Sequence, residues 1–301
     1  MLFMSAPLLL ASLLVIGIAS SFPHENLRKP RLGRPISSYL SKRGEPQTPD
    51  TEYPDTETHP NHLDQLEAAI QDAFELCDYV LTTPGHGIDS DSPIFTKYFD
   101  EGDRAGVKSV FQTIQPSSGV GNDLLDNIFL QNEDPDGKCD DRTLAASYLE
   151  GDDPFIVTCP SLFNKKAVTP LKGAESNDGH YIACDELLSG DGNTGTGAVS
   201  YKMNSLGMTL LHEYTHYDAM LETIFGAPII DQADANGEPI GYGPVQVRAL
   251  DKKLAPFNAD SYAYYASEVL WSIICVADFT DPSAGVDDAD PNCSSSPCEA
   301  P

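Results

Sequence analysis

The sequence predicts an α+β fold that is mainly helical and contains a small β-sheet. Apolar residues recur at threes and fours in segments near both ends of the chain, and short runs of β-type residues lie between them. A third observation is the run 212–216, which reads H-E-x-x-H and lies in an apolar segment that favours a helix. Helices, then a small sheet, then helices again is an order typical of α+β domains.

The N-terminal part of the chain carries the marks of a processed leader. It begins with a short apolar stretch followed by small residues, which predicts a secretory signal peptide. A basic segment follows and ends in Lys42-Arg43, which predicts a propeptide that is cleaved before Gly44. An acidic, non-periodic segment rich in Pro and Thr then predicts a disordered linker. We therefore expect a signal peptide, a propeptide, a linker, a metallopeptidase domain and a flexible acidic tail at residues 1–21, 22–43, 44–61, 62–280 and 281–301.

Two helices are expected at the start of the folded domain. Apolar residues at helical spacing predict the first from Leu63 to Leu81, with Asn61 as its cap. A second segment, 92–114, has the same periodicity. Gly102 and Gly106 can break it into two helices, because glycine disfavours a helix interior.

The middle and the end of the domain follow a different pattern. Short β-type runs predict strands at 147–149, 155–160 and 181–184. The H-E-x-x-H run is expected within a helix that covers 203–221. A last helix is expected over 260–277, where aromatic and aliphatic residues recur at helical spacing.

The charge and the cysteines of the chain limit its function and its compartment. The formal net charge is −28, and removal of residues 1–43 leaves 12 basic and 45 acidic side chains, a charge of −33. Such a charge argues against binding to nucleic acid or to anionic membranes through a broad basic face. We expect a secreted, extracellular monomer without a membrane span. Seven cysteines fit a compartment that permits disulfides, although an odd number leaves at least one unpaired in a monomer.

The run H-E-x-x-H predicts a zinc site. On a helix, residues four apart share a face, so the imidazoles of His212 and His216 can bind one Zn²⁺. Glu213 follows the first histidine, where it can reach a water at the metal and act as a general base.

These residues and several flanking strings resemble the deuterolysin (aspzincin) family of secreted fungal zinc metalloendopeptidases. The resemblance implies a zincin-like fold, with H-E-x-x-H on a central helix, and an enzyme made as a zymogen that acts on proteins or peptides. It also implies that Tyr242 donates a hydrogen bond to the oxyanion. Asp260 would belong to a helix that lines the cleft. The strings that carry the resemblance are Tyr98-Phe99, Ile156–Phe163, Thr209–His216, Tyr242-Gly243 and Asn258–Ala266.

The same resemblance implies two disulfides, Cys139–Cys159 and Cys184–Cys275. For the remaining cysteines the alternatives stay open. Cys293 and Cys298 can pair with each other, or one of them can pair with Cys77.

The third zinc ligand departs from the family's pattern. In that pattern it is the aspartate of G-T-x-D-x-x-Y-G, and counting back from Tyr242 places Pro239 at its position. Asp231 ends an apolar run and is our first choice, because catalytic zinc takes three protein ligands. Asp234 and Asp218 are the alternatives.

Two functions from different classes are compatible with these residues. The first is a zinc endopeptidase with Glu213 as general base. The second is a secreted, non-proteolytic zinc-binding surface protein, related to fungal zinc-binding antigens. The missing in-register aspartate favours the binding protein, whereas an intact Glu213 and Tyr242 favour the enzyme, since a pure binder gains nothing from a general base.

Overall fold

The α+β class is observed in the described part of the chain. A computed structural model describes residues 34–35, 62–115, 128–131, 134, 137–140, 143–150, 153–164, 182–188 and 197–284, all within the unit Leu32–Pro301. The predicted signal peptide, the linker, the cap residue Asn61 and the cysteines 293 and 298 lie outside these residues.

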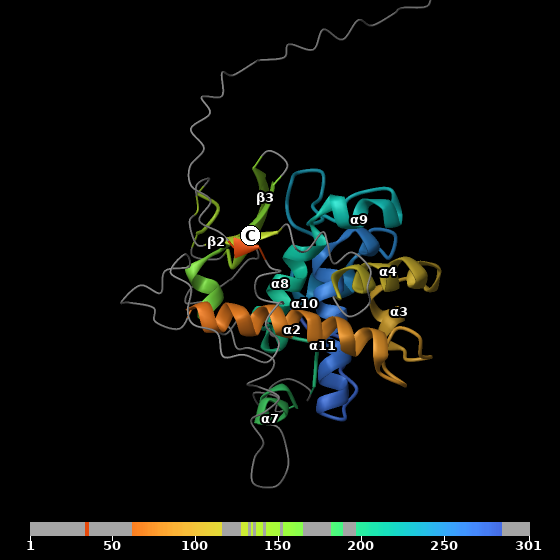
Figure 1. The fold of residues 1–301 in the computed structure, drawn as a ribbon. Helices are drawn as coiled ribbons and strands as arrows, with labels where there is room; N and C mark the ends of the chain where they lie inside the picture. Colours follow the sequence, from red (N-terminus) through yellow and green to blue (C-terminus); the bar gives the residue numbers. More distant parts are fainter. Residues whose placement is uncertain are drawn as a thin grey trace, which may run out of the picture. The chain divides into compact units, whose positions relative to one another are not determined.

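Four strands of the described residues form one sheet, in the order β1-β2-β4-β3 (Figure 1). The central strand β4 (Asp153–Thr158) pairs in parallel with β2 (Phe129–Gln131) and antiparallel with β3 (Ala145–Glu150). The edge strand β1 (Arg34–Pro35) pairs antiparallel with β2. It comes from the segment predicted as a propeptide, so the uncleaved chain contributes a strand to the sheet.

The strand predicted at 147–149 is confirmed as part of β3. The strand predicted at 155–160 is confirmed up to Thr158, where β4 ends, whereas Pro160 already begins the 3₁₀ turn η3. Phe155, Ile156 and Val157 are all buried, as expected for a strand covered on both faces. Strand β2 was not predicted, because its apolar run Ile128–Leu130 is too short to show a period.

The strand predicted at 181–184 is wrong, because residues Ile182–Leu188 form the helix α7. Cys184 and Leu187 are buried one helical turn apart, while Asp185 and Glu186 between them are exposed. Buried residues at this spacing need a helix, and a short apolar run cannot separate helix from strand by sequence alone.

The helices surround a core that spans most of the described domain. The helix predicted from Leu63 is confirmed as α2. Among the described residues, no helix is both long and apolar enough to cross a membrane. The helices and 3₁₀ turns before β2 are α2 (His62–Thr82), α3 (Ile94–Tyr98), η1 (Glu101–Asp103) and α4 (Arg104–Ile114). Those after β4 are η3 (Pro160–Asn164), α7, η4 (Tyr201–Met203), α8 (Leu206–Thr215), α9 (Asp218–Phe225), α10 (Gly243–Ala249), η5 (Ala255–Phe257) and α11 (Ala259–Ile274).

The segment predicted as one broken helix, 92–114, is broken once. The break falls after α3 and includes the 3₁₀ turn that contains Gly102, whereas Gly106 lies inside α4. The last predicted helix, 260–277, ends earlier than expected. Cys275 closes α11, and Val276 then adopts a positive φ of 50°.

Helix α8, which carries H-E-x-x-H, packs against α2, α11 and the edge strand β3 (Figure 1). Its approach to α2 requires a glycine. A Cβ at Gly207 would lie 2.5 Å from Cβ of Asp72 and 2.8 Å from the backbone nitrogen of Ala73. The two backbones therefore meet at a distance that no other residue permits.

Helix α11 is fixed by an aromatic cluster and by a buried carboxylate. Glu268 is fully buried; it accepts hydrogen bonds from Lys97 Nζ at 2.6 Å and from the Tyr98 hydroxyl at 2.7 Å. These contacts tie α11 to α3. The cluster brings together aromatic rings from α4, from α11 and from the residue that caps the end of α3, with neighbouring centroids 5.2–5.9 Å apart: Phe99, Phe111, Tyr262 and Tyr265.

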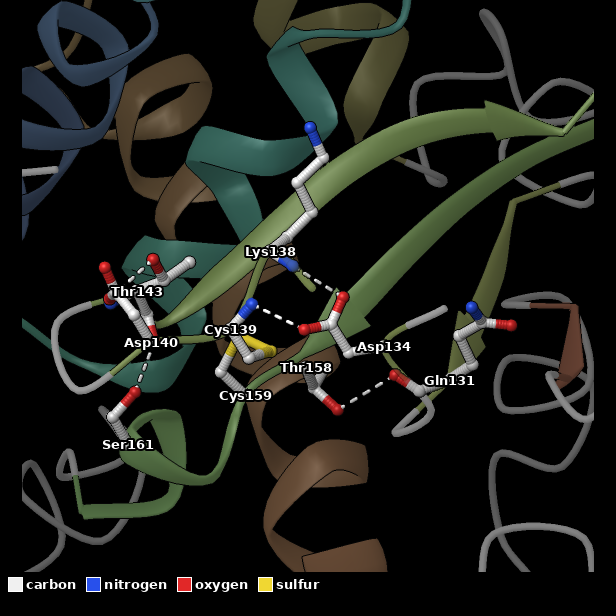
Figure 2. Close-up of a disulfide and its surroundings, with 9 residues drawn as sticks. All are labelled: Gln131, Asp134, Lys138, Cys139, Asp140, Thr143, Thr158, Cys159 and Ser161. Carbon is white, nitrogen blue, oxygen red and sulfur yellow. Dashed lines mark hydrogen bonds between the residues drawn. A yellow bond between two sulfur atoms is a disulfide. The ribbon is translucent and has the colours of Figure 1, made fainter. Parts of the chain in front are cut away.

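Both disulfides implied by the family resemblance are present. Cys139 is bonded to Cys159, which directly follows β4, and Figure 2 shows this bond beside the pairing of β2 with β4. There the carboxylate of Asp134 accepts from the backbone N–H of Cys139 at 2.7 Å. The second bond joins Cys184 in α7 to Cys275 at the end of α11. Cys77 is a buried free thiol, so the alternative in which it is bridged is wrong.

The two disulfides are expected to stabilise the fold unequally. They close loops with sequence separations of 20 and 91 residues. Restriction of the unfolded chain then contributes about 3 kcal/mol for the first and about 4.5 kcal/mol for the second. Urea unfolding of the two double-serine variants checks this order. A larger loss in the Cys139→Ser/Cys159→Ser protein would contradict it.

Candidate metal centre

Helix α8 begins at an N-cap serine and ends within the H-E-x-x-H run. Ser205 accepts a hydrogen bond from the backbone N–H of Met208 at 3.2 Å, as an N-cap does. At the other end, the Thr215 hydroxyl donates to the carbonyl of His212 at 2.7 Å, and the backbone N–H of His216 turns to Glu213. The single helix predicted over 203–221 is therefore wrong.

Both histidines keep a common face despite this break, because His216 at the helix end retains a right-handed helical backbone. Nε2 of His212 and Nε2 of His216 lie 3.1 Å apart. The other ring nitrogen of each is bound to an acceptor. Nδ1 of His212 contacts Oδ1 of Asp260 at 2.6 Å, and Nδ1 of His216 contacts the carbonyl of Ile229 at 3.1 Å. Each Nδ1 therefore carries the proton, and in the neutral rings each Nε2 presents a lone pair.

Asp231 faces the same point, although it comes from a loop. Backbone pairing of Ile230 with Phe257 and Ala259 fixes this part of the loop against the start of α11, with N···O distances of 3.0 and 3.2 Å. Oδ1 of Asp231 lies 3.2 Å from Nε2 of His212 and 3.5 Å from Nε2 of His216. Its side chain is 35 % exposed, but Oδ1 itself is buried and no hydrogen bond reaches it.

These three atoms match a cation in chemistry and in spacing. Two lone pairs and one carboxylate oxygen face one another, and none can donate a hydrogen when both rings are neutral. In a tetrahedral site with bonds of about 2.0–2.1 Å, neighbouring ligand atoms lie about 3.3 Å apart. The separations of 3.1, 3.2 and 3.5 Å agree with that value. His212, His216 and Asp231 therefore fit Zn²⁺.

The histidines and carboxylates at this point shift one another's pKa values. Burial alone would lower the pKa of His212, but Asp231 and Asp260 outweigh it and raise that pKa well above its ordinary value. Burial would raise the pKa of Asp231, but the two histidines lower it below its ordinary value. A metal ion bound at this point would therefore compete with protons for the same nitrogen and oxygen atoms.

Tyr242 and Glu213 border the three candidate ligands. The Tyr242 ring lies 5.8 Å from the His212 ring, between centroids, and its phenol is close enough to Asp231 for that carboxylate to act on its pKa. Burial, followed by the charge of Asp231, raises the pKa of this phenol far above its ordinary value, so the phenol stays protonated and able to donate. Glu213 is 5 % exposed and lies close enough to add to the same shift.

The two alternative ligands lie elsewhere. Asp234 is at the exposed tip of a hairpin, where its carboxylate accepts from the backbone N–H groups of Asn236 and Glu238 at 2.8 and 3.0 Å. Asp218 is exposed in the first turn of α9. Among the described residues, the group able to hold a metal contains Asp231 and neither alternative.

The sequence analysis placed Asp260 near the site but did not predict its role. It was expected only to belong to a helix that lines the cleft, but its two carboxylate oxygens bind two different segments of the site. Oδ1 contacts His212, and Oδ2 accepts from the backbone N–H of Gly243 at 2.8 Å. An aspartate in the first turn of a helix is common, so no sequence signal pointed to these partners.

No protein-family model and no curated protein matches this chain.

Proposed function

We propose that this protein is a secreted zinc-dependent endopeptidase, made as a zymogen, with a zincin-like fold similar to that of the deuterolysins. The observation that carries the proposal is the convergence of His212, His216 and Asp231 on one point, where two imidazole nitrogens and one carboxylate oxygen face one another at separations of 3.1–3.5 Å. An acid and a phenol of suitable chemistry, Glu213 and Tyr242, stand beside that point.

The proposed reaction is the hydrolysis of a peptide bond. Bound zinc supplies Lewis acidity, which polarises the carbonyl group and lowers the pKa of a water. Glu213 removes a proton from the water as its oxygen bonds to the carbonyl carbon, and later delivers that proton to the leaving nitrogen as the C–N bond breaks. Tyr242 donates a hydrogen bond to the carbonyl oxygen as negative charge develops there.

The remaining residues hold the ligand set in place. The carboxylate of Asp260 keeps the proton of His212 on Nδ1, and the carbonyl of Ile229 does the same for His216. Such partners fix the ring orientation and raise the basicity of the coordinating nitrogen. Both disulfides agree with an oxidising compartment, which supports the proposed secretion.

The observation that favoured a non-proteolytic zinc-binding protein was the absence of an aspartate in register before Tyr242. That absence no longer favours the binding protein, because an aspartate at a different position in the sequence, Asp231, lies beside the two histidines. The buried Glu213, which a pure binding protein does not need, supports the enzyme.

Casein cleavage by the secreted protein tests the proposal. We expect cleavage that a phenanthroline chelator abolishes and that added zinc restores, together with about one zinc per chain. If the protein binds one zinc but does not cleave casein, the endopeptidase is refuted and the zinc-binding surface protein becomes the better assignment. Cleavage that survives complete removal of the metal would refute a zinc mechanism.

A further inference from the structure

Asn258 is fully buried at the N-cap of α11, and its side chain bonds to both ends of one loop. Its Oδ1 accepts from the backbone N–H of Gln232 at 3.2 Å. Its Nδ2 donates to the carbonyl of Gly241 at 3.0 Å and to the hydroxyl of Ser261 at 3.0 Å. One planar amide thus clamps the two ends of segment 232–241.

These two ends are next to the residues proposed to act. Gln232 follows Asp231, and Gly241 precedes Tyr242. Between them the chain forms a hairpin whose own backbone bond, from Ile240 N–H to the carbonyl of Gln232 at 2.9 Å, closes its base. Residues 233–238 are exposed, so the tip does not hold the base against the core.

Other contacts support one side of the loop but not both. Ile230 pairs with the backbone near the start of α11, which holds the Asp231 side. Asp260 accepts from the backbone N–H of Gly243, which holds the Tyr242 side. Among the hydrogen bonds of the described residues, those of the Asn258 side chain connect to both ends of the loop, at Gln232 and at Gly241. We propose that Asn258 is a positioning residue that sets the Asp231 carboxylate relative to the Tyr242 phenol.

The chemistry of the position demands an amide. One end of the loop offers a donor and the other an acceptor, so the side chain must accept at one atom and donate at the other. Aspartate has the same shape but would place an oxygen against the carbonyl of Gly241. The fit is also tight, because a Cβ at Gly241 would lie 2.1 Å from Oδ1 of Asn258.

Asn258→Asp tests the proposal, with Asn236→Asp as the matched control. The control makes the same change at the exposed tip of the same hairpin. We expect Asn258→Asp to weaken zinc binding by about 10–100-fold, as loss of a supporting partner does, and to lower kcat with KM nearly unchanged. Asn236→Asp should match the wild type. Zinc affinity is measured by competition with a chromophoric chelator, and kcat and KM with a casein peptide at saturating zinc.

The outcomes separate this proposal from the proposed function on which it rests. If the wild type binds zinc without cleaving peptides, the peptidase fails, but the zinc affinities still test Asn258. If Asn258→Asp keeps the zinc affinity and kcat of an active wild type, the positioning role is refuted while the function stands. A wild type that binds no zinc overturns both.

A second variant covers a failure of Asn258→Asp to fold. Gly241→Ala presses a methyl group against the same amide and should weaken zinc binding in the same direction. If both variants are unfolded, Asn258 supports the whole domain rather than the site, and the positioning role is refuted.

Discussion

Replacing Asp231 with alanine is expected to remove zinc and activity together. The substitution leaves two imidazoles facing the metal position, whereas catalytic zinc takes three protein ligands. Zinc content measured by atomic absorption should fall from about one equivalent per chain to a small fraction of it, and casein cleavage should fall in proportion.

Asp234→Ala is the matched control for that result. It makes the same change three residues later, at a carboxylate that accepts hydrogen bonds from the hairpin tip and does not face the histidines. We expect nearly full zinc content and activity. If instead Asp231→Ala kept both and Asp234→Ala lost them, the ligand would be assigned to the wrong residue.

Glu213→Gln is expected to retain the metal and lose the reaction. The amide has the shape of the carboxylate but cannot accept the proton of a water, and a positioned base contributes about 10²–10⁴-fold to the rate. Zinc content should remain close to one equivalent, because Glu213 does not belong to the group that can hold a metal. Steady-state cleavage and atomic absorption on one preparation check both halves of the prediction.

Glu238→Gln is a suitable control, since it makes the same change at an exposed acid of the nearby hairpin. It should leave cleavage unchanged. Wild-type activity in Glu213→Gln would remove the general base from the mechanism, whatever the zinc content.

The candidate site was predictable where it depends on local geometry. His212 and His216 share a face because they are four residues apart near the end of one helix, and that spacing is visible in the sequence. Asp231 could be proposed but not decided, since its position depends on the pairing of Ile230 with a segment that begins at Phe257. Contacts between residues so far apart in the chain leave no local pattern.

Errors in the predicted elements have a similar origin. Residues 182–188 form a helix that buries side chains one turn apart. Tertiary packing decides which of these side chains are buried, and so short a run does not show it in the sequence. Helix α8 ends at Thr215, where the backbone N–H of His216 bonds to the carbonyl of Glu213, three residues earlier, and the regular helix stops. The apolar periodicity of the sequence continues beyond Thr215 and therefore does not indicate this end of the helix.

The hairpin closed by Asn258 uncouples sequence spacing from spatial spacing. Because its two ends are held together, the length of chain between Asp231 and Tyr242 can vary while the two side chains keep their places. The entropic cost of closing a flexible loop rises by only about 0.6 kcal/mol for each doubling of its length. The exposed tip at Asn236 and Gly237 is therefore a suitable position for inserted peptides. A peptide inserted at this tip would leave the segments that carry Asp231 and Tyr242 in place, so the tip can accept added sequence without a change at the candidate site.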